Sequence, residues 1–129
     1  GGVQVTADPA PGVELVAEHR DMREELAACC VTINPVQGIR GSPLKVAESI
    51  AAGRVCVATE GGSRGFAELG IESLISTPDV PSMAGPLADL LQAQSRRHRL
   101  ESSGRERIHH LDWQSLGVKL SQLLRETLA

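Results

Sequence analysis

Two basic residues lie close together in a glycine-rich part of the sequence. Arg40 belongs to the turn Gly38–Gly41, and Lys45 follows it by five residues. Ser42 and Pro43 signal the start of a helix, with Ser42 as the N-cap and Pro43 as the first helical residue. Lys45 is then the third helical residue, where a cation costs about 0.3–1 kcal/mol because the helix N-terminus is already positive. A bound anion would remove this cost.

A phosphate group is the anion that this arrangement suits best. Glycines such as Gly38 and Gly41 let backbone N–H groups approach a ligand closely, and a helix N-terminus beside them adds positive potential. The motif is not a Walker loop, and no dinucleotide fingerprint follows the first expected strand. Taken one at a time, Arg40 and Lys45 are more typical of solvated surface charges than of a phosphate site, and Glu48 also suits an exposed ion pair with Lys45.

The helix that carries Lys45 is expected over Pro43–Ala52, with Gly53 just past its end. Its apolar residues have the spacing of one helix face and are expected to pack on a sheet; they are Val46, Ala47, Ile50 and Ala51. The opposite edge carries three polar residues at i, i+3 and i+4, namely Lys45, Glu48 and Ser49. The two charged side chains are therefore expected on the same side of this helix.

Short apolar runs rich in valine and isoleucine predict the strands that would position this helix. We expect strands at Val3–Thr6, Val13–Ala17, Cys30–Asn34, Val55–Thr59 and Ser73–Thr77. Between them, helices are expected over Asp21–Cys29 and Pro43–Ala52, with a short turn near Phe66–Leu69. Alternating strands and helices predict an α/β fold, a Rossmann-like parallel sheet with helices on both sides.

After Thr77 the pattern changes to helices alone. One apolar stripe consists of Met83, Leu87, Leu90 and Leu91, and a strongly charged stretch follows at 96–110. A second stripe consists of Trp113, Leu116, Leu120, Leu123 and Leu124, which predicts an amphipathic final helix. We therefore expect a Rossmann-like domain over residues 1–112 and a C-terminal helix over residues 113–129.

Composition argues against several classes of partner. A net charge of −3 and only two aromatic residues, Phe66 and Trp113, do not suit nucleic-acid binding. Cys29, Cys30 and Cys56 match no zinc spacing, so we expect buried free thiols in a reducing compartment. His109 and His110 are adjacent and point to different sides of a helix, so no metal site is expected.

One segment resembles a known family. The stretch INPVQGIRGSPLKVAESIAAGRVCVATEGGSRGF is similar to the donor-binding core of retaining glycosyltransferases with the GT-B fold, also called group 1 or family 4-like. The matching residues are Pro35, Gly38, Gly41, Lys45, Glu48, Ala52, Gly53, Val55, Val57, Thr59, Gly61 and Gly65. The resemblance covers about residues 12–128 and is most specific over 45–65. It implies the C-terminal, donor-binding half of a GT-B enzyme.

The resemblance assigns roles to the residues of the glycine turn and the helix. Glu48 would accept hydrogen bonds from the ribose hydroxyls of a nucleotide-sugar. The turn Gly38–Pro43, which includes Gly41 and Ser42, would hold the diphosphate or the donor sugar through its backbone amides. The residues themselves, rather than the resemblance, make Arg40 and Lys45 the expected catalytic cations that neutralise the leaving diphosphate.

Two further candidates lie outside that helix. The loop Glu18–Met22 would sit beside the nucleotide base, which makes His19 a candidate contact. Ser63, in the loop Gly61–Gly65, is a candidate phosphate contact, although both residues are also ordinary turn residues.

The resemblance also implies a function for the parent protein. It would be a hexosyltransferase that moves a sugar from a nucleoside diphosphate to a sugar, a lipid-linked sugar or a protein, with retention and without a cofactor or metal. This chemistry belongs to the synthesis of polysaccharides, lipopolysaccharides or glycoconjugates, in the cytoplasm or at the inner face of the membrane.

The acceptor-binding N-terminal domain and the first strand–helix unit would be missing from this chain, so we expect the fragment alone to be inactive. In GT-B enzymes the final helix often crosses to the N-terminal domain; without that domain, we expect its apolar stripe to make a homodimer.

Two departures from the family pattern keep other functions open. The family's first glutamate, eight residues before Glu48, falls at Arg40, and the usual basic pair of the first strand–helix unit is lacking. A non-catalytic α/β interaction module is therefore an alternative. A nucleotide-sugar epimerase-like domain, which shares the two-domain architecture, is another.

Overall fold

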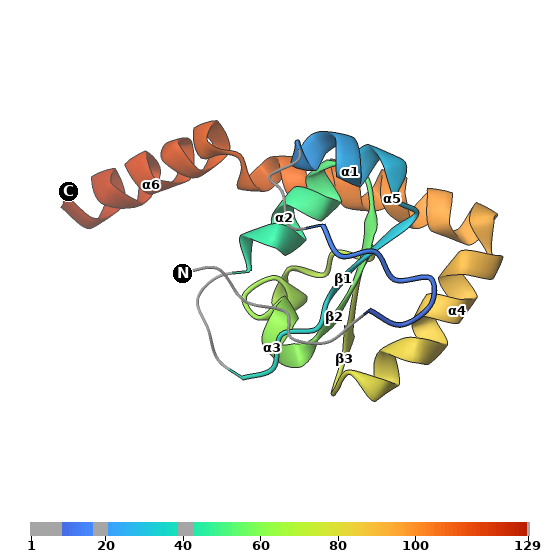
Figure 1. The fold of residues 1–129 in the computed structure, drawn as a ribbon. Helices are drawn as coiled ribbons and strands as arrows, with labels where there is room; N and C mark the ends of the chain where they lie inside the picture. Colours follow the sequence, from blue (N-terminus) through green and yellow to red (C-terminus); the bar gives the residue numbers. More distant parts are fainter. Residues whose placement is uncertain (1–8, 17–20, 39–42, 129) are drawn as a thin grey trace.

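A computed structural model describes residues 9–16, 21–38 and 43–128 (Figure 1). In chain order its elements are α1 (Met22–Ala28), β1 (Val31–Asn34), α2 (Leu44–Ala51), β2 (Val55–Thr59), α3 (Glu60–Ser63), η1 (Ala67–Leu69), β3 (Leu74–Thr77), η2 (Pro81–Met83), α4 (Ala84–Gln92), α5 (Gln94–Ile108), η3 (His109–Leu111) and α6 (Trp113–Leu128). The η elements are single turns of 3-10 helix.

The described strands form one parallel sheet in the order β1-β2-β3. Val31 lies opposite Val55, and Cys56 lies opposite Leu74. These strands confirm the three predicted at Cys30–Asn34, Val55–Thr59 and Ser73–Thr77, each to within one residue. Because all three run in the same direction, their carboxyl ends meet at one edge of the sheet.

Helices cover both faces of the sheet, as the continuous apolar run of β2 predicts. All five residues of β2 are buried, and alternate residues point into different clusters. Cys56 and Ala58 belong to a cluster with residues of α2, of α5 and of the segments on either side of η1, which are Val46, Ile50, Phe66, Ile71 and Ile108. Val55 and Val57 belong to a second cluster with Met83 and Leu90. The α/β class is therefore confirmed.

The strand predicted at Val13–Ala17 is wrong over its described residues. Residues 13–16 have no regular structure, and the side chains of Val13, Leu15 and Val16 are about half exposed. A strand needs a neighbour to accept its backbone hydrogen bonds. The N–H of Val13 bonds instead to the carbonyl of Ala10 across a turn, at 2.9 Å. The other early strand, at 3–6, lies outside the described residues.

Helix α2 differs from the prediction at its start and on one face. Pro43 is its N-cap, without a side-chain cap, so Lys45 is the second helical residue rather than the third. Ser49 was expected on the polar edge but is buried, because its small hydroxyl fits against β1 and bonds to the Thr32 hydroxyl. Ala51 is exposed rather than packed on the sheet. At the other end, Gly53 adopts φ +74, the left-handed conformation that terminates helices.

Burial of the three cysteines is only partly as expected. All three are described and free; Cys56 is buried in β2, Cys29 is half-buried, and Cys30 is exposed. Burial raises the pKa of the Cys56 thiol, which keeps it protonated and unreactive. Cys30 was expected to be buried, but it precedes β1 and therefore lies outside the sheet.

The C-terminal half is helical, as predicted, but its faces are buried unequally. Leu90 of α4 is fully buried, whereas Leu91 is 61% exposed and lies off the packed stripe. Helix α5 comes close to the sheet at Gly104, where an added Cβ would lie 1.8 Å from the Ser73 hydroxyl. Helix α6 begins after Asp112, whose carboxylate accepts the Ser115 N–H at 2.6 Å, and it projects away from the rest of the molecule (Figure 1).

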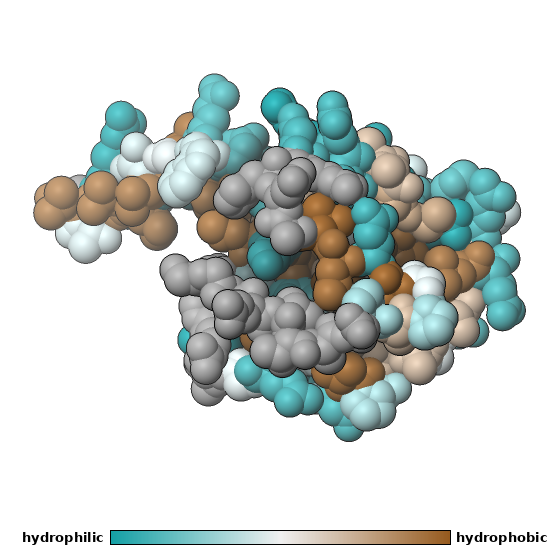
Figure 2. All heavy atoms as spheres, in the orientation of Figure 1, coloured by the Kyte–Doolittle hydropathy of each residue, from teal (hydrophilic) through white to brown (hydrophobic). Residues whose placement is uncertain are grey.

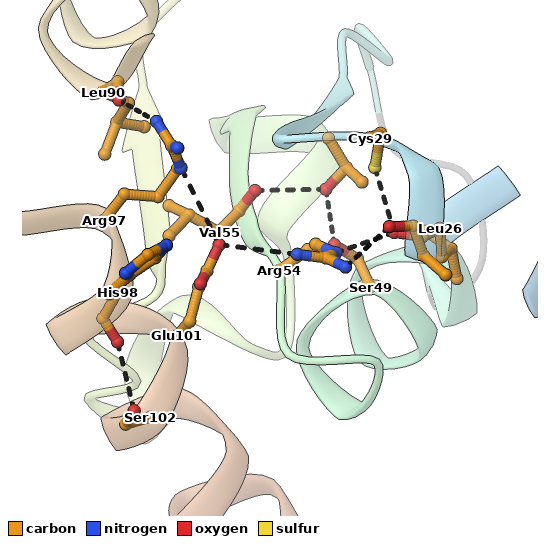
Figure 3. Close-up of polar contacts among 12 residues, drawn as sticks. Leu26, Cys29, Ser49, Arg54, Val55, Leu90, Arg97, His98, Glu101 and Ser102 are labelled. Carbon is orange, nitrogen blue, oxygen red and sulfur yellow. Dashed lines mark hydrogen bonds and ion pairs between the residues drawn. The ribbon is translucent and has the colours of Figure 1, made fainter. Parts of the chain in front are cut away.

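A polar cluster ties α1, α4 and α5 together around Arg54 (Figure 3). The Arg54 guanidinium donates to the carbonyls of Leu26 and Ala27 at 2.7 and 2.9 Å, which satisfies two free carbonyls at the end of α1. It also lies 3.8 Å from Glu101, which Arg97 approaches at 3.9 Å while donating to the carbonyl of Leu90.

Replacing Arg54 with alanine should lower the free energy of unfolding by about 1–3 kcal/mol, because the partly buried carbonyl of Leu26 and the exposed carbonyl of Ala27 lose their donor. Urea denaturation of the two proteins measures this difference. The exposed Arg96 of α5 provides the control, since Arg96→Ala should change stability by less than about 0.5 kcal/mol. Equal losses in both variants would show that the Arg54 contacts add nothing.

Among the described residues, no helix is both long and apolar enough to cross a membrane.

Candidate functional site

The three described parallel strands end at a cavity of about 500 Å³. Each strand contributes residues that follow its carboxyl end, and the cavity is lined by Gln37, Gly38, Thr59, Glu60, Gly61, Arg64 and Pro78. This edge is where ligands bind in open α/β sheets. We call it the strand-end cavity.

Hydrogen bonds fix the two loops that frame the strand-end cavity. The Thr59 hydroxyl caps α3 by accepting the N–H of Gly62 at 3.1 Å, and it donates to the carbonyl of Val36. The buried amide of Asn34 donates to the carbonyl of Gly62 at 2.8 Å. These bonds hold the start of α3 against the loop after β1, so the wall of the cavity is built before any ligand binds.

Two glycines make this close approach possible. A Cβ added at Gly62 would lie 2.3 Å from the carbonyl oxygen of Asn34, and one added at Gly61 would lie 2.7 Å from that of Gly38. Backbone atoms cannot move aside as the end of a flexible side chain can. Gly62 and Asn34 were not singled out from the sequence, although the pair of glycines just after β2 was the available signal.

Among the residues predicted for the site, only some are described. Gly38 lies in the strand-end cavity with φ +80, a left-handed conformation that suits glycine. Lys45 is exposed in the first turn of α2. The remaining candidates Arg40, Gly41, Ser42 and His19 lie outside the described residues.

Glu48 lines a different cavity. This second cavity, of about 620 Å³, is mostly apolar and lies between α2, η1 and the start of α6. We call it the lateral cavity; its lining residues include Leu44, Ala47, Glu48, Phe66, Ile108, Leu111, Trp113 and Leu116. The structure therefore places Gly38 and Glu48 on two separate cavities, whereas the sequence analysis placed them around one donor.

Ser63 is fully buried, and its hydroxyl lies 2.8 Å from the hydroxyl of Ser76. It also donates to the carbonyl of Glu60 at 3.4 Å. A phosphate contact by Ser63 would require this hydroxyl to leave Ser76. In the structure Ser63 joins α3 to β3 and so supports the cavity wall from behind.

Arg64 is a cation that the sequence analysis missed. It is exposed, follows α3 directly and lines the strand-end cavity. Its position directly after the EGGS segment of α3 could have identified it from the sequence. An arginine beside a glycine turn is well placed to bind an anion through two parallel N–H groups. Glu60 lines the same cavity, so its walls carry both signs of charge.

Among the described residues that line the strand-end cavity there is neither cysteine nor histidine, and the Thr59 hydroxyl is already engaged with Val36. Among the described residues, no group of three His, Cys, Asp or Glu side chains could hold a metal ion. The described lining provides the Arg64 cation, the Glu60 carboxylate and the backbone of Gly38 and Gly61, which a ligand can approach closely.

The chain matches a known protein family over most of its length. A family model described as "Glycosyl transferases group 1" matches residues 3–93. The matched region contains the three described strands, α1 to α4 and the described residues that line the strand-end cavity, whereas α5 and α6 lie beyond it. No curated protein matches the chain.

Proposed function

This chain belongs to the group 1 glycosyl transferases, and on that basis we propose that its strand-end cavity holds part of a nucleoside-diphosphate-sugar donor. The observation that carries the proposal is the pre-built glycine wall at the carboxyl ends of three parallel strands. A backbone wall that is already ordered loses little conformational entropy when a ligand binds. The free energy of its contacts therefore contributes to the affinity in full.

The diphosphate is the part of the donor that the surroundings of this cavity suit. Arg64 lies on its wall and Lys45 lies in the first turn of α2. We assign Arg40, Gly41 and Ser42 to the same task, because they connect Gly38 of the cavity to α2 along the chain. Together these groups would neutralise the two phosphates without a metal ion.

In the proposed reaction, the bond between the sugar and the diphosphate breaks, and negative charge grows on the leaving diphosphate. Cations fixed in position before the reaction stabilise that charge, since they need no reorganisation at the transition state. Lys45 and Arg40 are the catalytic cations of this proposal. We propose that the sugar is a hexose and is transferred with retention, as in GT-B enzymes, with this chain as their C-terminal domain.

Glu48 takes the ribose in this proposal. Its carboxylate is exposed on the side of α2 that faces the lateral cavity. The donor would then extend from the strand-end cavity, past the first turn of α2, to the lateral cavity. His19 would stand beside the base.

The acceptor, a sugar, a lipid-linked sugar or a protein, would bind to a further domain of the parent protein. We place the reaction in polysaccharide or glycoconjugate synthesis on the cytoplasmic side of a membrane. A non-catalytic interaction module is the second candidate function, and the separation of Gly38 and Glu48 on two cavities favours it.

Calorimetric titration with nucleoside diphosphates should detect weak binding, in the millimolar range. Inorganic diphosphate should compete, because the proposed contacts are to phosphate. Arg64→Ala should weaken binding about tenfold, since a charge-assisted hydrogen bond contributes about 1.5–3 kcal/mol when it is protected from water and less here. The control is Arg107→Ala, an exposed arginine of α5 far along the chain from this cavity.

The absence of binding heat from a protein whose circular dichroism shows a folded α/β domain would favour the interaction module. Equal weakening by Arg64→Ala and Arg107→Ala would show non-specific attraction rather than a site.

A further inference from the structure

Glu60 is the acidic residue on the described wall of the strand-end cavity. It is exposed, begins α3 and lines the cavity together with Arg64. A carboxylate and a phosphate group repel each other, and the repulsion grows where a ligand displaces the water between them. Glu60 would therefore oppose a ligand that consisted of phosphate alone. It suits a ligand that carries another kind of group beside its phosphates.

The carboxylate of Glu60 has no partner within the described part of the chain. Arg64 follows it by four residues, the spacing at which opposite charges meet on a helix. Helix α3 ends at Ser63, however, and the backbone of Arg64 leaves helical geometry, with φ −52 and ψ 131. None of the ion pairs between described residues includes either side chain. Both charges therefore remain available to a ligand.

The backbone of Glu60 is fixed at the cavity by its neighbours. Gly61 lies so close to the loop after β1 that an added Cβ would be 2.7 Å from the carbonyl oxygen of Gly38. At the other end of α3, the hydroxyl of the buried Ser63 lies 2.8 Å from that of Ser76 in β3. Helix α3 is thus held from both sides, and it cannot move to take Glu60 away from a ligand.

Sugar hydroxyls are the groups that suit this carboxylate. An ionised carboxylate only accepts hydrogen bonds, and each hydroxyl has one hydrogen to donate. Bonds to a charged acceptor are stronger than bonds between neutral groups. In a nucleoside-diphosphate-sugar the hydroxyls lie beside the diphosphate, so Arg64 and Glu60 can act on neighbouring parts of one ligand. Figure 2 shows hydrophilic side chains along the lower edge of the molecule, where α3 and the end of β3 lie in Figure 1.

We propose that Glu60 selects the donor sugar by charge: it accepts a neutral, hydroxyl-bearing sugar and rejects a sugar acid. This rests on the proposed function, since the phosphate end of the donor must lie in the strand-end cavity. A sugar acid would bring a second carboxylate towards Glu60, and such repulsive elements are a common source of specificity. Because Glu60 is exposed, salt screens the repulsion, and the discrimination falls as the ionic strength rises.

Three small probes separate the attraction of phosphate from the selection of the sugar. They are inorganic phosphate, α-glucose 1-phosphate and α-glucuronate 1-phosphate; the two sugar phosphates differ in one group, a hydroxymethyl or a carboxylate. NMR titrations of the whole chain, followed through the amide signals of Gly61 and Gly62, report binding at this cavity. At low ionic strength the wild-type chain should bind glucose 1-phosphate about threefold to fivefold more tightly than glucuronate 1-phosphate.

Glu60→Gln should reduce this ratio to about one, because glutamine carries no charge. The same variant should bind inorganic phosphate more tightly than the wild type does, since one repulsive charge is gone. Glucose 1-phosphate should gain less than inorganic phosphate, because its hydroxyls lose a charged acceptor.

Glu68→Gln is the matched control. Glu68 is an exposed glutamate of η1 and is not among the residues that line the strand-end cavity, and its replacement changes the net charge by the same amount. This variant should keep the wild-type ratio between the two sugar phosphates.

The results that would overturn this selection differ from those that would overturn the proposed function. If none of the probes shifts the signals of Gly61 and Gly62 in a folded chain, the cavity binds no phosphate and both proposals fail. If the probes bind but Glu60→Gln keeps the wild-type ratio, the cavity holds phosphate and only the selection by Glu60 fails. An equal change in Glu68→Gln would show that the net charge of the chain discriminates the sugars, rather than Glu60.

Discussion

Replacing Gly62 with alanine should lower the free energy of unfolding by about 3 kcal/mol, at the upper end of what an added methyl group costs in a tightly packed region. The methyl group would lie 2.3 Å from the carbonyl oxygen of Asn34. To relieve this contact, α3 must move away from β1. That movement breaks the bond between the Asn34 amide and the carbonyl of Gly62, which is 2.8 Å long.

Urea denaturation should show this loss as a lower midpoint, with an unchanged slope if the variant still folds to the same compactness. Gly85→Ala is the matched control. Gly85 lies in α4, where an added Cβ meets nothing within 4 Å, so alanine should be neutral or stabilise the helix by up to about 1 kcal/mol. If Gly62→Ala is as stable as Gly85→Ala, the wall of the strand-end cavity is not as tightly held as the contacts indicate.

The second large effect concerns Glu48 and depends on the proposed function. In the full-length parent, Glu48→Gln should reduce turnover of the nucleotide-sugar about 10- to 100-fold. A carboxylate that accepts two ribose hydroxyls makes charge-assisted hydrogen bonds worth about 1.5–3 kcal/mol, and an amide cannot replace both. Steady-state kinetics with the natural donor measures the change.

Stability should hardly change in Glu48→Gln, because the Glu48 side chain is exposed in the described structure. Glu106→Gln, an exposed glutamate of α5, should leave both turnover and stability at the wild-type level. Wild-type turnover by the Glu48 variant would make this residue an ordinary surface charge. It would also favour the interaction module over the donor site.

Periodicity was enough to predict the sheet and most of the helices. Four of the five buried residues of β2, Val55–Ala58, form an unbroken apolar run, and the stripe of the final helix repeats at helical spacing, so both patterns are visible over a short window. The strand at 13–16 was wrong because an apolar run does not reveal whether a neighbouring strand is available to pair with it. Ser49 was misplaced for a related reason: its burial depends on Thr32 of β1, which lies in another element.

The candidate site was predictable only in part. The glycine turn could be named because glycines and cations beside a helix start are typical of an anion site, and Glu48 because it matches the family pattern. The bonds from Asn34 to Gly62 and from Thr59 to Val36 join segments 28 and 23 residues apart in the chain. No local pattern carries such contacts, and for the same reason the division of the site residues between two cavities could not be foreseen.

The order of the strands has a consequence for the sequence of folding events. Each strand pairs with the next strand along the chain, β1 with β2 and β2 with β3. The loops that must close are therefore short for a parallel sheet, which favours a fast search and lets strands add one by one as the chain leaves the ribosome. The cluster on the α2 face includes Ile108 at the end of α5, so this face is complete only once α5 has formed. Until α5 has been synthesised, Val46, Ile50 and Cys56 remain open to solvent or to a chaperone.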